Sequence, residues 1–187
     1  METLVIRGLL AGFLAGLSIG PVAIWGAQLR SEKYHDAFVI IAGASIGNIF
    51  VGGWLLALAV VLEVPLADIH AVFERLTVPS LLWAGAALIW MASHGPTANS
   101  WSEGRRFVTA FAVSAFWPGT PALTAYWLIQ HWGASDNPWL FFCFFVAGVV
   151  AAWLWNIEFF YWWGSWAPAV IRVAGASCVV AACIKLV

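Results

Sequence analysis

Two proline elements inside long apolar stretches are the first candidates for chemistry in this sequence. Gly-Pro at residues 20–21 lies within the stretch 4–29, and Pro-Gly-Thr-Pro at residues 118–121 lies within 107–129. Proline has no backbone N–H, so each one leaves a helical carbonyl without its donor. In hydrocarbon such a carbonyl is costly unless it faces protein or water, so both elements predict a lined cavity.

Few polar side chains accompany these breaks, and their chemistry suits a small polar solute. Hydroxyl and amide groups can bind such a solute through hydrogen bonds, with Thr124 adding one further hydroxyl, and the N-terminus of a half-helix can bind a carboxylate. The ring before the second break can gate the cavity or stack on a cation. The residues that we expect at the substrate site are Ser18, Gly20, Pro21, Asn48, Ser114, Trp117, Pro118, Thr120 and Pro121.

Glu158 is the carboxylate that lies within an apolar stretch, and two interpretations of it stay open. It precedes Gly164 by about six residues, or roughly 9 Å along a helix, and it lies beside aromatic residues. Its side chain can extend past this aromatic belt to the membrane surface. Alternatively, Glu158 carries the proton that couples transport.

The composition places these residues in a membrane. Of 187 residues, 63% are hydrophobic and 9% are charged, and the net charge is -1. The charge count excludes a nucleic-acid-binding surface. Since about 20 apolar residues cross a hydrocarbon core of ~30 Å, we expect an all-α membrane protein with one transmembrane domain of six helices. Their expected ranges are about 4–29, 37–61, 78–92, 107–129, 139–163 and 167–187.

An amphipathic segment precedes the third expected helix. Apolar residues at helical spacing alternate with charged ones over 66–76. This segment lies flat on the membrane surface or extends the third helix.

Small-residue patterns recur in the two halves of the chain. Ala-Gly with a small residue four positions on occurs at 42–47 and 147–152, and Ala-Gly-Ala occurs at 84–86 and 174–176. Together with the two proline elements, these matches predict one repeat over 1–93, a linker over 94–106 and a second repeat over 107–187. Three crossings are an odd number, so the second repeat is inverted relative to the first, as in many secondary transporters.

The first stretch also carries a glycine at every fourth position, Gly8, Gly12, Gly16 and Gly20. Such a smooth face lets another helix approach closely, which predicts tight packing and possible homo-oligomer formation. The stretch is too long for the apolar region of a signal peptide, so we interpret it as a true span. Five Lys or Arg residues on one side against three on the other favour both termini outside the inner membrane.

The cysteines and histidines do not predict a cofactor or metal site. Cys143, Cys178 and Cys183 lie in spans without a C-x-x-C pattern, and the four histidines lie in loops or at helix ends. A metal-ion exporter would need Asp, Glu or His beside the two proline elements, and an enzyme of thiol-electron transfer would need cysteines there. A third alternative is a non-transporting assembly subunit whose glycine face serves association only.

The glycine-rich run 8–21, which ends in Gly20-Pro21, resembles the start of the LysE/RhtB-type amino-acid exporters. The motif Gly43-x-x-x-Gly47-Asn48 resembles that family's second helix, 107–129 resembles its fourth, and 172–175 its last. The chain departs from the family pattern at Val22, Asn48 and Trp117, where polar or acidic groups are usual.

The resemblance implies a secondary transporter that exports a small amino-acid-like solute by alternating access. It does not imply an enzyme. Its expected partners are the solute, membrane lipid and a proton for coupling. No nucleotide-binding loop is present, so an ion gradient or the solute gradient would supply the energy.

Overall fold

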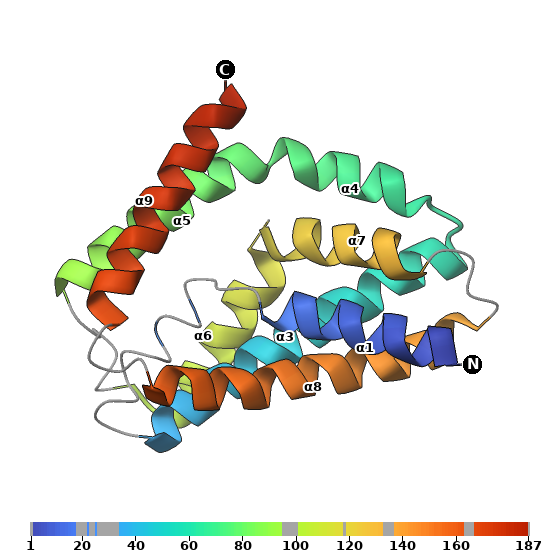
Figure 1. The fold of residues 1–187 in the computed structure, drawn as a ribbon, viewed down its shortest axis with the longest axis horizontal. Helices are drawn as coiled ribbons and strands as arrows, with labels where there is room; N and C mark the ends of the chain where they lie inside the picture. The colour runs from blue at the N-terminus through green and yellow to red at the C-terminus, as the bar shows by residue number, and fades with distance from the viewer. Residues whose placement is uncertain are drawn as a thin grey trace.

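The structure is a computed structural model that describes residues 2–17, 22, 25, 34–94, 101–117, 119–132, 137–162 and 167–186. All regular structure in these residues is helical, which confirms the all-α prediction for them (Figure 1). The helices are α1 (Glu2–Gly16), α3 (Tyr34–Val61), α4 (Leu66–Arg75), α5 (Thr77–His94), α6 (Glu103–Phe116), α7 (Gly119–Trp132), α8 (Pro138–Trp162) and α9 (Ala167–Leu186).

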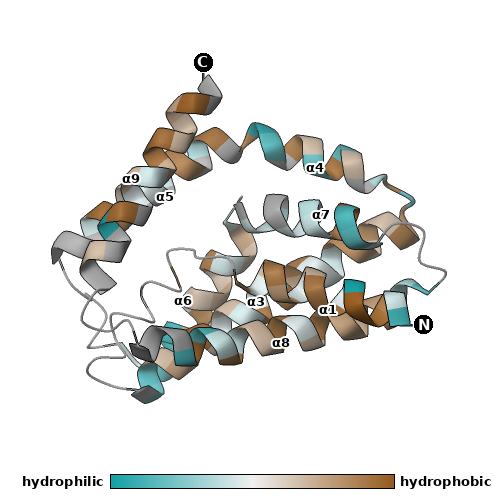
Figure 2. Ribbon diagram, in the orientation of Figure 1, coloured by the Kyte–Doolittle hydropathy of each residue, from teal (hydrophilic) through white to brown (hydrophobic). Residues whose placement is uncertain are grey.

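Two of these helices are long and apolar enough to cross a membrane. Their apolar segments are His35–Val61 in α3 and Pro138–Glu158 in α8, within a few residues of the expected second and fifth helices. The apolar runs in α5 and α9 are shorter, at Leu81–Trp90 and Gly175–Ile184. Figure 2 shows hydrophobic residues along α1, α3, α8 and α9, whereas hydrophilic residues interrupt α4.

The fourth expected helix is interrupted in the described residues. In the first expected stretch, α1 ends at Gly16, and of residues 18–29 the structure describes only Val22 and Trp25, both helical. In the fourth stretch, α6 ends at Phe116 and α7 begins at Gly119, so the helix is interrupted where the sequence places Pro118.

Helix α6 begins inside the predicted linker 94–106. The Ser102 side chain accepts a hydrogen bond from the Arg105 N–H at 3.4 Å, which caps the helix. Helix α4 is a separate helix that packs against α7, with the His70 and Tyr126 rings 6.0 Å apart. Because Leu76 separates α4 from α5, α4 does not extend that helix without a break.

The helices pack mainly as pairs that join distant parts of the chain: α1 with α8, α3 with α6, and α5 with α9 (Figure 1). The glycine face of α1 is used within the chain, because Gly8, Gly12 and Gly16 all lie against α8. An oligomer that used this part of the face would have to open the α1–α8 contact.

The α3–α6 and α1–α8 contacts are built alike. A Cβ atom at Gly43 would lie 2.6 Å from the Phe107 carbonyl oxygen, and one at Gly148 would meet the Leu9 carbonyl oxygen even more closely. One turn further, Gly47 lies against the Ser114 side chain. In the α1–α8 contact the glycine comes from the other helix of the pair: Gly16 matches Ser114, and its neighbour Ala152 matches Gly47.

In the α5–α9 contact, the matching residues of the two halves lie against each other. A Cβ at Gly85 would lie 2.8 Å from the Gly175 oxygen, and one at Gly175 would lie 3.0 Å from the Gly85 oxygen. Gly85 also meets Val179, while Gly175 meets Ile89. Each of these glycine contacts therefore has a counterpart in which residues of the two halves of the chain have exchanged places.

Candidate functional site

The candidate site lies at the interruption between α6 and α7. Trp117 has an extended backbone (φ -66°, ψ 120°), and its N–H donates to the Val113 oxygen at 3.0 Å. The Thr120 N–H in turn donates to the Trp117 oxygen at 2.9 Å. These bonds hold the chain in a tight bend, so that one helix ends and the next begins within three residues.

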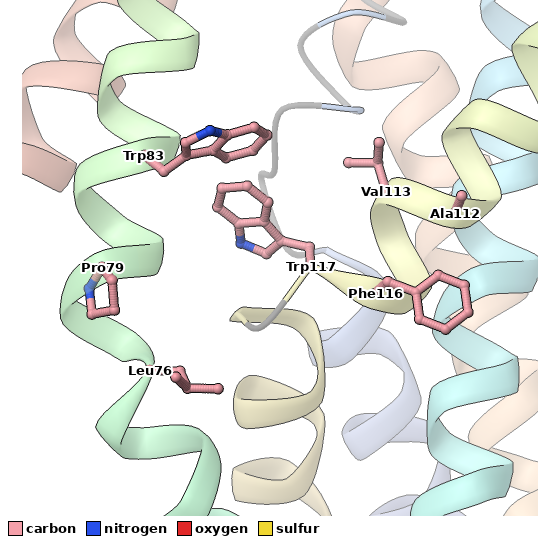
Figure 3. Close-up of a pocket in the computed structure, with 7 residues that line it drawn as sticks. All are labelled: Leu76, Pro79, Trp83, Ala112, Val113, Phe116 and Trp117. Atoms are coloured by element: carbon pink, nitrogen blue, oxygen red, sulfur yellow. The ribbon is translucent and has the colours of Figure 1, made fainter.

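A cavity of about 570 Å³ opens beside this bend, between α5 and α6. The Trp117 ring lies against Trp83 with centroids 4.1 Å apart and planes inclined by 38° (Figure 3). The ring is therefore engaged with α5 rather than with a buried polar group. All the lining residues are apolar or aromatic: Leu76, Pro79, Trp83, Ala112, Val113, Phe116 and Trp117.

Several of the predicted polar residues are buried behind this bend. Asn48 on α3 and Ser114 on α6 are both buried, and they flank the same contact, because Gly47 touches Ser114. On α7, Thr124 is only 1% exposed, Pro121 is buried and Thr120 is half-buried. Buried polar side chains therefore occur on α3, α6 and α7, and the contact of Gly47 with Ser114 brings α3 and α6 together beside Asn48.

Four predicted residues, Ser18, Gly20, Pro21 and Pro118, lie outside the described residues. Glu158 is exposed on α8, so it is not among the buried polar side chains. Both interpretations of its role remain predictions.

Asn156 is a polar residue at the end of α1 that the sequence analysis missed. Its side-chain amide donates to the Gly16 carbonyl oxygen at 3.1 Å and so joins α8 to the end of α1. This is a carbonyl that the end of the helix leaves without a backbone donor. The signal in the sequence was an amide within the apolar stretch 139–163, where an unbonded polar group is costly.

An ion pair between Asp36 and Arg106 was also missed. Sequence analysis placed both in polar connections, yet Asp36 is in the first turn of α3 and Arg106 is in α6. The Arg106 Nη1 and Asp36 Oδ1 atoms form a buried salt bridge. Their opposite charges at the ends of two apolar stretches were the available signal.

Aromatic and charged groups surround this pair. Trp25 packs edge-on against Trp101 at 5.7 Å, and the Arg105 guanidinium lies over the Trp101 ring at 4.2 Å. The exposed side chains of His35 and Glu103 lie 3.6 Å apart. The His35–Glu103 pair joins the beginning of α3 to the beginning of α6.

His131 lies in the last turn of α7, beyond the expected span 107–129. Burial and, to a smaller extent, the positive charge of Arg7 lower the pKa of His131. Its Nε2 is buried with no hydrogen-bond partner among the described residues, and the ring stacks on Trp127 at 5.8 Å. Among those residues no three His, Cys, Asp or Glu side chains are grouped as a metal site would require.

No family model, curated protein or solved structure matches this chain.

Proposed function

We propose that the protein is a secondary transporter with six transmembrane helices in two inverted halves, and that it exports a small amino-acid-like solute across the inner membrane. The observation that carries this proposal is the exchange of contacts between the halves. Gly43–Phe107 corresponds to Gly148–Leu9, and Gly85–Val179 corresponds to Gly175–Ile89. A two-fold axis in the membrane plane would relate the members of each pair, as in transporters with inverted repeats.

The broken helix between α6 and α7 supports the same function. Helix α6 ends at Phe116 and α7 begins at Gly119, beside the buried hydroxyl of Ser114. Broken helices in transporters expose backbone groups to the substrate near the middle of the membrane. The second broken helix of the proposal would be the one that contains Gly20-Pro21.

The chemistry of the buried polar residues supports a polar solute. Asn48 provides both a donor and an acceptor, and Ser114 and Thr124 each provide a hydroxyl. The resemblance of residues 8–21 to amino-acid exporters supports the solute class and the direction. Alternating access would follow from rocking one half against the other.

Flux measurements test this proposal. Proteoliposomes loaded with the twenty protein amino acids should release at least one of them faster than protein-free vesicles, as measured by mass spectrometry of the outer solution. Pro21→Ala and Pro118→Ala should each slow this release, because both restore a helical donor at a break. Pro65→Ala, in the exposed connection before α4, is the matched control and should not.

Two outcomes would contradict the proposal. Wild-type vesicles that release every amino acid at the rate of protein-free vesicles would exclude this transport. Folded Pro21→Ala and Pro118→Ala variants with wild-type rates would show that the breaks have no part in it.

A further inference from the structure

Asp36 and Arg106 are the only buried Asp, Glu, Lys or Arg side chains among those that the structure describes, at 7% and 4% exposure. Arg106 binds Asp36 through the Oδ1 atom of the carboxylate. The second oxygen, Oδ2, is buried and has no hydrogen-bond partner within the described residues. Among the described residues, the carboxylate is therefore bound through one oxygen only.

A buried ion pair of this kind adds little to the stability of a protein. Removing two charges from water costs several kcal/mol for each ion, and apolar residues of similar volume often replace a buried ion pair without loss. The other half of the chain provides such a replacement. In the correspondence between the halves, Gly43 matches Gly148 and Phe107 matches Leu9. The same spacing matches Asp36 with Phe141 and Arg106 with Gly8. Phe141 and Gly8 carry no charge and pack against each other.

The geometry points to Arg106 as the residue that binds the carboxylate of the transported solute, with Asp36 occupying that place in the empty protein. This inference rests on the proposed transport function and deepens it. An arginine guanidinium matches a carboxylate in shape and charge. A solute carboxylate would take over the bond to Arg106, and Asp36 would turn towards water.

The surroundings of the pair allow this exchange. His35 precedes Asp36, and Glu103 lies one turn before Arg106; their side chains are 68% and 66% exposed. Water is thus close to the released Asp36 carboxylate. Because Asp36 and Arg106 join α3 to α6, the exchange would also loosen the contact between these helices at one end.

The position suggests a first capture point rather than the central site. Ser114 follows Arg106 by two turns of α6, or about 12 Å at 1.5 Å per residue. A solute captured at Arg106 would then move inward to the buried hydroxyls and amide of Ser114, Thr124 and Asn48.

The test compares amino acids with their amides. The probes are a mixture of the twenty protein amino acids and the corresponding mixture of amino-acid amides, which lack the carboxylate charge. Wild-type proteoliposomes should carry the amino acids at least tenfold faster than the amides. Asp36→Asn removes the internal competitor, so its half-saturating amino-acid concentration should fall, whereas Arg106→Gln should abolish the preference for amino acids.

A charge swap separates solute binding from a structural role. Asp36→Arg combined with Arg106→Asp keeps two opposite charges and should keep the fold, as measured by size-exclusion chromatography and thermal unfolding, while flux falls at least tenfold. The matched control, His35→Gln with Glu103→Gln, changes the exposed pair and should behave as wild type. Because the swap keeps both charges, it remains informative if Asp36→Asn does not fold.

The outcomes distinguish this inference from the proposed function. Wild-type flux in the folded charge-swap variant would overturn the role of Arg106 and leave transport intact. Equal flux of amino acids and amides through the wild-type protein would also overturn the role of Arg106 and leave transport intact. No flux of either mixture through the wild-type protein would overturn both.

Discussion

At the scale of single residues, the bond from Asn156 to Gly16 explains how α1 can end inside an apolar structure. Gly16 is the last residue of α1, so no residue within that helix donates to its carbonyl, and the Asn156 amide from α8 supplies a donor at 3.1 Å. An uncompensated backbone carbonyl in an apolar environment is expensive. Asn156 therefore satisfies this carbonyl at the end of α1 without water.

Replacing Asn156 by Leu should lower the free energy of unfolding by about 1–3 kcal/mol, since the Gly16 carbonyl would be left without a partner. Thermal unfolding of the purified protein in detergent measures the change. Trp155→Phe, at the exposed neighbouring position, is the control and should have little effect. An unchanged midpoint in Asn156→Leu would mean that another donor reaches this carbonyl.

The lowered pKa of His131 makes stability depend on pH. Burial and the Arg7 charge disfavour the protonated imidazole in the folded protein, so the unfolded chain binds the proton more readily. Stability should therefore fall as the pH drops below about 6.5, the pKa of an unperturbed histidine.

His131→Gln should reduce this loss of stability between pH 7.5 and pH 5, as measured by the midpoint of thermal unfolding at both values. His35→Gln, at an exposed position, is the matched control and should leave the difference nearly unchanged. An equal loss in wild type and His131→Gln would assign the pH effect to other groups.

Individual residues differ in how far the sequence predicts them. Asn48 and Ser114 lie within apolar stretches of the sequence, and both are buried in the structure, whereas their role as substrate-site residues stays a prediction. The opposite charges of Asp36 and Arg106 are visible in the sequence, but their contact could not be predicted, because it depends on where α3 and α6 begin and on how the two helices align. Both beginnings fall earlier than the apolar pattern indicates, since polar residues form the first turns.

At the scale of elements, the glycine face of α1 acts as a contact surface for α8. At Gly12 an added Cβ atom would overlap the carbonyl oxygen of Phe145, which is backbone and cannot rotate away. Helix packing in membranes relies on such close approach.

Gly12→Ala should therefore destabilise the protein by about 1–3 kcal/mol, the usual effect of overpacking. Thermal unfolding in detergent measures it. Gly104→Ala is the matched control: no atom lies within 4 Å of its added Cβ, and alanine favours helix over glycine. A Gly12→Ala protein as stable as wild type would mean that α1 shifts along α8 without loss.

The interruption of the fourth helix was predicted from its prolines, and the structure places it between Phe116 and Gly119. The partners of the helices were not predictable. A row of small residues indicates which face packs tightly, but not which helix it meets. The packing of α1 with α8 and of α3 with α6 is a tertiary property of the chain.

At the scale of the whole molecule, the proposed topology places alternate connections on opposite sides of the membrane. Ser102 lies in the connection before α6 and Asn137 in the one before α8, and both are exposed. With both termini outside, we expect Ser102 in the cytoplasm and Asn137 outside.

Ser102→Cys and Asn137→Cys, each in a background without the native cysteines, should therefore react differently with a membrane-impermeant maleimide. In intact cells only Asn137→Cys should be labelled, and in permeabilised cells both variants should be labelled. Labelling of both in intact cells would contradict the six-helix topology, whereas labelling of Ser102→Cys alone would reverse the orientation.

The contact between Gly85 and Gly175 has a mechanical consequence. In the proposed two-fold arrangement, a residue can touch its own counterpart only where the axis passes. A point on the axis stays in place when the two halves exchange conformations. The crossing of α5 and α9 would thus serve as the pivot of the molecule, and the distance across it would stay constant while the Trp83–Trp117 separation changes through the cycle.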